Sequence, residues 1–141
     1  TVYAELDMQP VRATLGNDAF IWVGTDIDGR AGVDSVAIRA GVDVTTTELA
    51  DKLSNIETID LSAAGSNHIL GGLTLADVVT ITGRNNGTLT IMGDEDDHVE
   101  LSRGSNWSGG AVNNDGYLVY TSGTVTLLID EEMAANISYV A

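Results

Sequence analysis

Short apolar runs alternate with glycine, aspartate and asparagine along most of the chain. Glycines and aspartates of this kind mark turns, and Asp115-Gly116 and Ser122-Gly123 are two clear examples. The runs that predict short strands are residues 20–23, 36–38, 56–61, 88–92, 98–101, 117–121 and 125–129. Short strands at this spacing predict an all-β fold, arranged as a sandwich, a roll or a solenoid.

Two segments carry a helical pattern instead. Residues 44–54 contain Thr45 and Glu48 in the spacing of a capping box, followed by two leucines four residues apart on one face. Residues 73–79 predict a second helix of one or two turns. Asn86-Gly87 lies between two runs that favour strands, residues 80–82 and 88–92, and this arrangement indicates a hairpin.

Charge narrows the possible functions. The chain has 141 residues, 43% of them hydrophobic, with 21 acidic and 6 basic residues and a net charge of −15. The length and the hydrophobic fraction suit one domain with a real core. The negative net charge disfavours binding to nucleic acid or to an anionic membrane. Divalent cations that take oxygen ligands, above all Ca²⁺, would relieve the electrostatic repulsion among the acidic residues. The alternative is a solvated acidic surface suited to a salty environment.

Cysteine is absent, which excludes disulfides and thiolate chemistry. No apolar stretch approaches the length of a transmembrane helix, so membrane insertion is not expected. The first nine residues carry two acids and no basic residue, unlike a signal peptide. We therefore expect a piece of a longer chain, or export by a route that uses another signal.

Two glycine–aspartate turns carry the most specific chemistry. Residues 29–36 (GRAGVDSV) fit the nonapeptide calcium repeat G-G-x-G-x-D-x-U-x with arginine in place of the second glycine, and residues 16–20 (GNDAF) fit its second half. In such a repeat the aspartate supplies a hard oxygen, and the apolar residue two positions later packs inside. Asp18 and Asp34 are therefore the first candidate Ca²⁺ ligands.

The segment between the two turns is irregular, because the copies are 16 residues apart and a regular array would need 9 or 18. It contains Asp26 and Asp28, which are further candidate ligands. The alternative is that these are ordinary turns in which Asp18 and Asp34 cap backbone N–H groups.

The order of several short motifs resembles the end of the calcium-repeat region in large RTX adhesins of Gram-negative bacteria. After the two turns come SNIETIDL at residues 54–61, GDEDDHVEL at 93–101, Trp107, DGY at 115–117 and VYTSG at 119–123. The resemblance covers most of residues 15–132. It departs from the family in lacking a complete G-G-x-G-x-D repeat.

The resemblance implies a protein exported by a type I secretion exporter to the medium or the bacterial surface. It implies a β-roll or β-solenoid-like segment with a capping β-sheet and one or two short helices, which folds when Ca²⁺ is met. It further implies upstream repeats of the same long chain as neighbours, and an export signal near the C-terminus.

A single domain is expected, in four parts. Residues 1–14 form a lead-in, 15–43 the degenerate calcium repeats, 44–132 a β-rich capping region and 133–141 a C-terminal tail. The tail suits an export signal or, alternatively, a plain final strand at 137–140.

A run of four carboxylates occupies residues 94–97, of which Asp96 and Asp97 are candidate ligands for a further ion. The alternative is a solvated loop. Trp107 lies in a loop of small polar residues and is either an exposed platform for a sugar ring or a lid over the core.

Enzymatic activity is not expected. Neither histidine has a partner at metal-ligand spacing, no serine-hydrolase motif is present, and six basic residues suit a polysaccharide-cleaving β-helix enzyme poorly. The expected function is a structural, calcium-binding module that ends a secreted adhesin. The alternative is an adhesive module that binds a surface glycan through Trp107.

Overall fold

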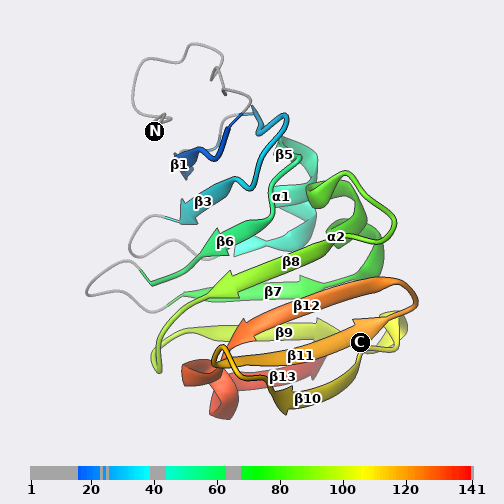
Figure 1. Cartoon of the computed structure of the whole chain (residues 1–141). Helices are drawn as coiled ribbons and strands as arrows, with labels where there is room; N and C mark the ends of the chain where they lie inside the picture. Colours follow the sequence, from blue (N-terminus) through cyan, green and yellow to red (C-terminus); the bar gives the residue numbers. More distant parts are fainter. Residues whose placement is uncertain (1–15, 23, 25, 39–43, 63–67, 141) are drawn as a thin grey trace.

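Three sheets form the framework of the protein in the computed structural model, which describes residues 16–22, 24, 26–38, 44–62 and 68–140 (Figure 1). The large sheet holds, in spatial order, β1 (Ala19–Trp22), β3 (Ser35–Ile38), β6 (Thr58–Asp60), β8 (Thr88–Met92), β12 (Val125–Asp130), β11 (Tyr117–Ser122) and β10 (Ser108–Val112). The second sheet holds β13 (Ile137–Val140), β9 (His98–Ser102), β7 (Ile69–Leu73) and β4 (Val44–Thr45). A third sheet pairs β2 (Ile27–Asp28) with β5 (Leu53–Ser54).

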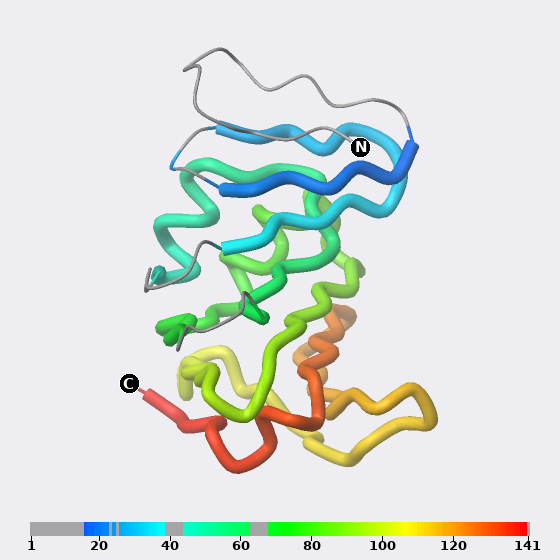
Figure 2. Tube along the Cα trace, turned by 90° about the vertical axis from the view of Figure 1, so that its left-hand side faces the viewer, coloured from blue at the N-terminus to red at the C-terminus, as the bar shows by residue number. Residues whose placement is uncertain are grey.

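Parallel pairing dominates the sheets. The strands from β1 to β12 in the large sheet are all parallel, as are the four strands of the second sheet and the pair β2–β5. From β1 to β10 the chain reaches each new strand of the large sheet after a passage through one of the other sheets, and Figure 2 shows these passages lying one below another. The strand-rich fold with short helices that the sequence predicts is therefore confirmed.

One column of side chains runs through the core of the large sheet. Phe20, Val36, Ile59, Ile91 and Ile129 are in register on successive parallel strands, and each is at most 1% exposed. Burial of such a side chain contributes roughly 1.5–3 kcal/mol. The apolar alternation seen in the sequence is thus the pattern that aligns the strands.

The helix α1 (Thr46–Lys52) begins where the capping pattern predicts, because the Thr45 hydroxyl accepts a hydrogen bond from the Glu48 amide at 3.1 Å. The second helix, α2 (Leu75–Thr82), starts after its N-cap Thr74 and ends at Gly83, whose φ of 72° is left-handed. It continues three residues beyond the predicted end.

The predicted hairpin around Asn86-Gly87 is wrong. Residues 80–82 belong to α2, where Ile81 and Thr82 are buried, so the Asn-Gly pair links a helix to β8. Sequence alternation over three residues does not separate a strand from a helix end. Parallel strands also require long connections, which a two-residue turn cannot supply.

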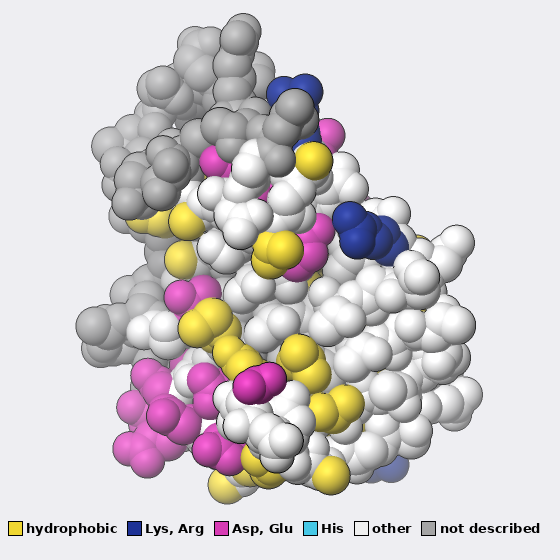
Figure 3. All heavy atoms as spheres, viewed as in Figure 1, with side chains coloured by type: hydrophobic (Ala, Val, Ile, Leu, Met, Phe, Trp, Pro, Cys, Tyr) yellow, Lys and Arg dark blue, Asp and Glu magenta, His cyan; other side chains and the backbone are white. Residues whose placement is uncertain are grey.

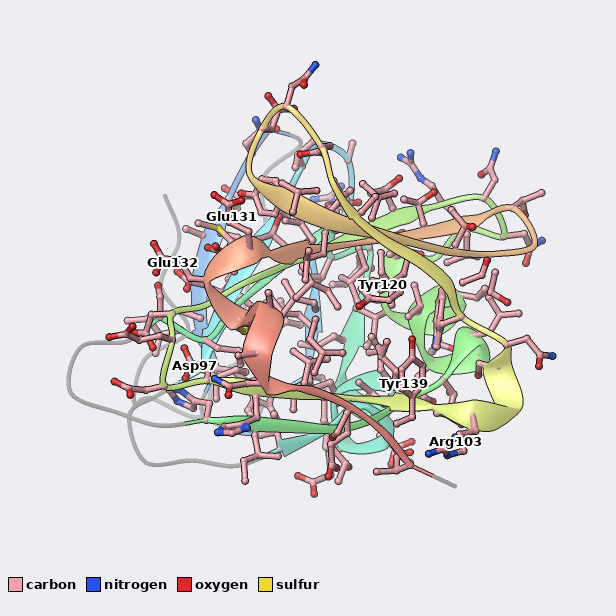
Figure 4. The ribbon with its side chains drawn as sticks, turned by 90° about the horizontal axis from the view of Figure 1, so that it is seen from below. Asp97, Arg103, Tyr120, Glu131, Glu132 and Tyr139 are labelled. Carbon is pink, nitrogen blue, oxygen red and sulfur yellow. The ribbon has the colours of Figure 1, made fainter. Side chains whose placement is uncertain are left out.

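Antiparallel strands occur only at the C-terminal end of the described large sheet, where β10, β11 and β12 form two hairpins. The predicted turns at Ser122-Gly123 and Asp115-Gly116 join them, and both glycines have positive φ. Two 3₁₀ helices, η1 (Arg103–Ser105) and η2 (Glu131–Asn136), precede β10 and β13. The tail forms the plain final strand β13, and the Tyr139 ring lies 5.8 Å from the Arg103 guanidinium (Figure 4).

Candidate functional site

The two predicted glycine–aspartate turns lie side by side in the fold. Phe20 and Val36, which follow Asp18 and Asp34 by two residues, are in register on the parallel strands β1 and β3. The Ser35 amide donates to the Asp18 carbonyl at 2.9 Å, and the Asn17 side chain accepts from the Val33 amide at 2.8 Å. The 16-residue spacing therefore still places the two turns next to each other, with β2 in the irregular segment between them.

The two aspartates are buried between these turns, with Asp18 4% and Asp34 0% exposed. One carboxylate oxygen of Asp34, Oδ1, accepts a hydrogen bond from the Asp18 amide at 2.7 Å. The other oxygen, Oδ2, is buried and has no hydrogen-bond partner among the described residues. Such an oxygen is costly to bury, so the place beside it suits a group that carries positive charge or a proton.

Burial away from water raises the pKa of the Asp34 carboxyl above its usual range. The hydrogen bond from the Asp18 amide acts against this shift, and the negative charges of Asp18 and Asp28 add to it. The carboxylate therefore lies in a negative environment in which a cation would be favoured.

Two glycines allow the close approach of neighbouring turns. A Cβ on Gly32 would lie 2.4 Å from the Gly16 carbonyl oxygen, and Gly32 has a φ of 112°. A Cβ on Gly29 would lie 2.3 Å from the Asn55 carbonyl oxygen and 2.6 Å from Asp34 Oδ2. Both glycines of the predicted repeat are thus needed for contact between turns, which is the physical basis of the pattern.

The two acids of the irregular segment have different surroundings. Asp28 Oδ1 accepts from the Asn55 side chain at 2.8 Å and from the Arg30 amide at 2.9 Å, and these hydrogen bonds hold the pKa of Asp28 below its usual range. The Asp26 side chain is 80% exposed and pairs with Lys52 at 3.5 Å. Asp28 thus lies beside the turn that contains Asn55, whereas Asp26 faces the surface.

Glu57 is an acid in this region that is not among the Ca²⁺ ligands predicted from the sequence. Its Oε2 accepts from the Asp34 amide at 2.8 Å, and its own amide donates to the Asp34 carbonyl at 3.0 Å. Burial raises the pKa of Glu57 and the charge of Asp34 raises it further, against the Asp34 amide and Arg84. The signal in the sequence is Asn55-Ile56-Glu57-Thr58-Ile59, which repeats the form of Gly-x-Asp-x-U with related residues.

The structure gives the two predicted ligands Asp96 and Asp97 different surroundings. Asp97 is 0% exposed and its Oδ1 accepts from the His68 amide at 2.9 Å and lies 3.3 Å from His68 Nδ1. Its Oδ2 accepts from the Asp94 amide at 2.9 Å. Both oxygens therefore bind protein groups, whereas Asp96 is exposed and its amide donates to Asp94 Oδ1 at 2.9 Å. A run of acids in sequence hides this difference in burial.

The other acids of this run form part of an exposed acidic surface. Acidic side chains gather at the lower left of Figure 3, over the segment between β8 and β9 and over η2. Figure 4 places Glu131 and Glu132 on η2 at the same end as Asp97. This matches the alternative of a solvated acidic loop.

Trp107 is a lid over the core and not a platform. The side chain is 7% exposed, and its indole N–H donates to the Leu73 carbonyl at 2.9 Å. A buried ring cannot stack on a sugar, so the glycan-binding alternative loses the residue on which it depended.

Within the described residues, no three histidine, aspartate or glutamate side chains surround a common point as a metal ion would require. An ion beside Asp34 would therefore need backbone carbonyls and water among its ligands. No described helix is long and apolar enough to cross a membrane. Comparison with protein-family models, with curated proteins and with solved structures finds no match.

Proposed function

We propose that this protein is a non-enzymatic, calcium-binding structural module of a secreted bacterial adhesin. The observation that carries the proposal is the Asp34 Oδ2 atom, a buried carboxylate oxygen without a hydrogen-bond partner among the described residues. It lies between stacked turns of the Gly-x-Asp-x-U form. Ca²⁺ suits this place because it binds carboxylate and carbonyl oxygens in flexible geometry.

The architecture within this proposal is one end of a β-solenoid. Parallel in-register strands and the continuous core column support it. The antiparallel hairpins β10–β12 would act as the cap that such a stack needs, because a last rung exposes an apolar face. Upstream repeats of the same chain would add beside β1, the outermost described strand of the large sheet.

Location at the cell surface or in the medium, and export by a type I exporter, belong to the same proposal. They follow from the resemblance to RTX adhesins, and the absence of cysteine is compatible with them. The net charge of −15 supports a role away from nucleic acid. Ca²⁺ outside the cell would then complete a fold that is unfavourable in its absence.

Calcium binding is tested by isothermal titration calorimetry and thermal unfolding in EDTA and in millimolar Ca²⁺. The wild-type protein should bind Ca²⁺ and melt at higher temperature with it, since an ion that binds the native state raises stability by mass action. Asp34→Asn should lose most of this gain, and Asp51→Asn, which removes the same charge from the exposed side of α1, should keep it. An unchanged wild-type melting temperature and no heat of binding would contradict the proposal.

A further inference from the structure

The turn at residues 55–59 occupies the same place in the fold as the two glycine–aspartate turns. Val36 is in register with Ile59, as Phe20 is with Val36, so Glu57 corresponds to Asp34 and Asp18. We call Asp18, Asp34 and Glu57 the acid column.

The backbone supports the same correspondence. Gly32, two residues before Asp34, has a φ of 112°, and Asn55, two residues before Glu57, has a φ of 54°. Asparagine is among the few residues other than glycine that adopt left-handed conformations at low cost. Asn-x-Glu-x-Ile and Gly-x-Asp-x-Val therefore share a positive φ at their first residue.

Hydrogen bonding repeats along the acid column. Asp34 Oδ1 accepts from the amide of Asp18, and Glu57 Oε2 accepts from the amide of Asp34 at nearly the same distance, 2.8 Å against 2.7 Å. Each carboxylate thus reaches back to the preceding turn. The column ends at the next turn, where the in-register position is Leu89, which is 0% exposed.

Asp34 Oδ2, which has no hydrogen-bond partner among the described residues, lies on the side of the third turn at residues 55–59. Asp34 Oδ2 and the Asn55 carbonyl oxygen both lie within 2.6 Å of the point where a Cβ on Gly29 would stand. The Gly29 amide donates to the Ser54 carbonyl at 2.9 Å, which fixes the second turn against the third. A carboxylate oxygen and a carbonyl oxygen therefore converge between these turns. The Glu57 carboxylate contacts the same aspartate, because its Oε2 accepts a hydrogen bond from the Asp34 amide.

We propose that residues 55–57 form a third calcium-binding turn, with the Asn55 carbonyl and the Glu57 carboxylate completing a Ca²⁺ site at Asp34 Oδ2. This rests on the proposed calcium-binding function and deepens it, because it places the ion between the second and third turns. Ca²⁺ takes 6–8 oxygen ligands, and carboxylates together with backbone carbonyls are its usual ones. The ion would also offset the mutual repulsion of Asp34 and Glu57.

The test is calorimetric titration of Ca²⁺ into wild type, Glu57→Gln, Asp34→Asn and Asp51→Asn. Glutamine retains an oxygen that can accept from the Asp34 amide, so Glu57→Gln removes the charge and little else. Its Ca²⁺ affinity should fall roughly tenfold or more, and Asp51→Asn should stay close to wild type. Wild-type affinity in a folded Glu57→Gln, together with loss in Asp34→Asn, would overturn the third turn and leave the calcium-binding function standing.

A second measurement needs no variant and covers the case in which Glu57→Gln fails to fold. The ¹³C shifts of side-chain carboxyl carbons are followed in wild-type protein as Ca²⁺ is added. The Glu57 and Asp34 carboxyl signals should both move with the same saturation curve, and that of Asp51 should not. A Glu57 signal that stays in place while that of Asp34 moves would overturn the proposal, and no movement of either would contradict calcium binding itself.

Discussion

The acid column differs from the residues that occupy the corresponding positions on the next two strands of the large sheet. In the first three turns the position two residues before the core column holds Asp18, Asp34 and Glu57; in the next two strands it holds Leu89 and Leu127. Both leucines are 0% exposed, as is Asp34. The N-terminal part thus buries charge where the C-terminal part buries apolar surface.

This difference indicates two sources of stability in one stack. Leucines at the corresponding positions stabilise the fold through burial of apolar surface alone. Carboxylates there lose hydration and recover it only in part through backbone N–H groups, as the raised pKa values of Asp34 and Glu57 indicate. On this account the C-terminal part folds by packing, and the N-terminal part depends on what neutralises its acids.

The largest effect is expected for Leu89→Ala, at the first apolar position after the acid column. Truncation of a fully buried leucine costs roughly 2–5 kcal/mol in unfolding free energy. The loss should be the same in EDTA and in Ca²⁺, because Leu89 binds no ion on this account. Urea denaturation in both buffers checks it, and a loss that Ca²⁺ restores would erase the difference between the two regions.

Gly32→Ala should be the next largest. The added Cβ would meet the Gly16 carbonyl oxygen at 2.4 Å, and the residue would hold a strained φ, which costs on the order of 1–3 kcal/mol. Gly24→Ala is the matched control, since its φ of 87° is also positive but a Cβ there has no described heavy atom within 4 Å.

The difference between the two alanine variants therefore isolates the contact between the first and second turns. Gly32→Ala should unfold at lower denaturant and bind Ca²⁺ more weakly than Gly24→Ala. Equal stability of the two variants would show that the turns do not pack as described.

The pH dependence of stability distinguishes the acid column from other acids. The pKa values of Asp34 and Glu57 are raised from their ordinary values of 3.8 and 4.5, so the folded protein holds protons that the unfolded chain has lost. In EDTA, the unfolding free energy should therefore rise as the pH falls through the raised values toward the ordinary ones. The lowered pKa of Asp28 has the opposite sign, and its contribution is lost only as the pH falls below 3.8.

Asp34→Asn and Glu57→Gln should each show a smaller rise than wild type over this window. Asp51→Asn is the control, because acidification also weakens the general repulsion among 21 acidic residues. A slope as steep in Asp34→Asn as in Asp51→Asn would mean that the acid column does not take up the protons.

The smallest effect is expected for Asp26→Asn. Its side chain is 80% exposed and paired only with Lys52 in the described contacts, and such surface pairs contribute about 0–1 kcal/mol. Calorimetry should find wild-type Ca²⁺ affinity, because Asp26 lies outside the acid column. Loss of affinity in this variant would move the site toward the irregular segment.

Local patterns in the sequence predicted several elements because their causes are local. The Thr45–Glu48 cap depends on residues three apart, and the Gly-x-Asp-x-U form placed Asp34 and Val36 correctly relative to their turn. Features set by distant partners could not be predicted in this way. The burial of Asp97 depends on His68, 29 residues away, and nothing within the acidic run indicates it.

Register between turns is the other feature that the sequence hides. The corresponding residues are 16 apart between the first two turns and 23 apart between the second and third. A search for a fixed period therefore misses the third turn, and Asn55 and Glu57 conceal it further by replacing glycine and aspartate. The signal that recovers it is that asparagine, like glycine, adopts a positive φ at low cost.

The most direct test of the account is amide hydrogen exchange of the wild-type protein in EDTA and in Ca²⁺, resolved by residue. Ca²⁺ should slow exchange in β1, β3 and β6, including the Asp18 and Asp34 amides that donate to the acid column. Exchange in β8, β11 and β12 should change much less, because these strands are stabilised by apolar packing. Equal protection of both regions by Ca²⁺, or protection of neither, would contradict the account.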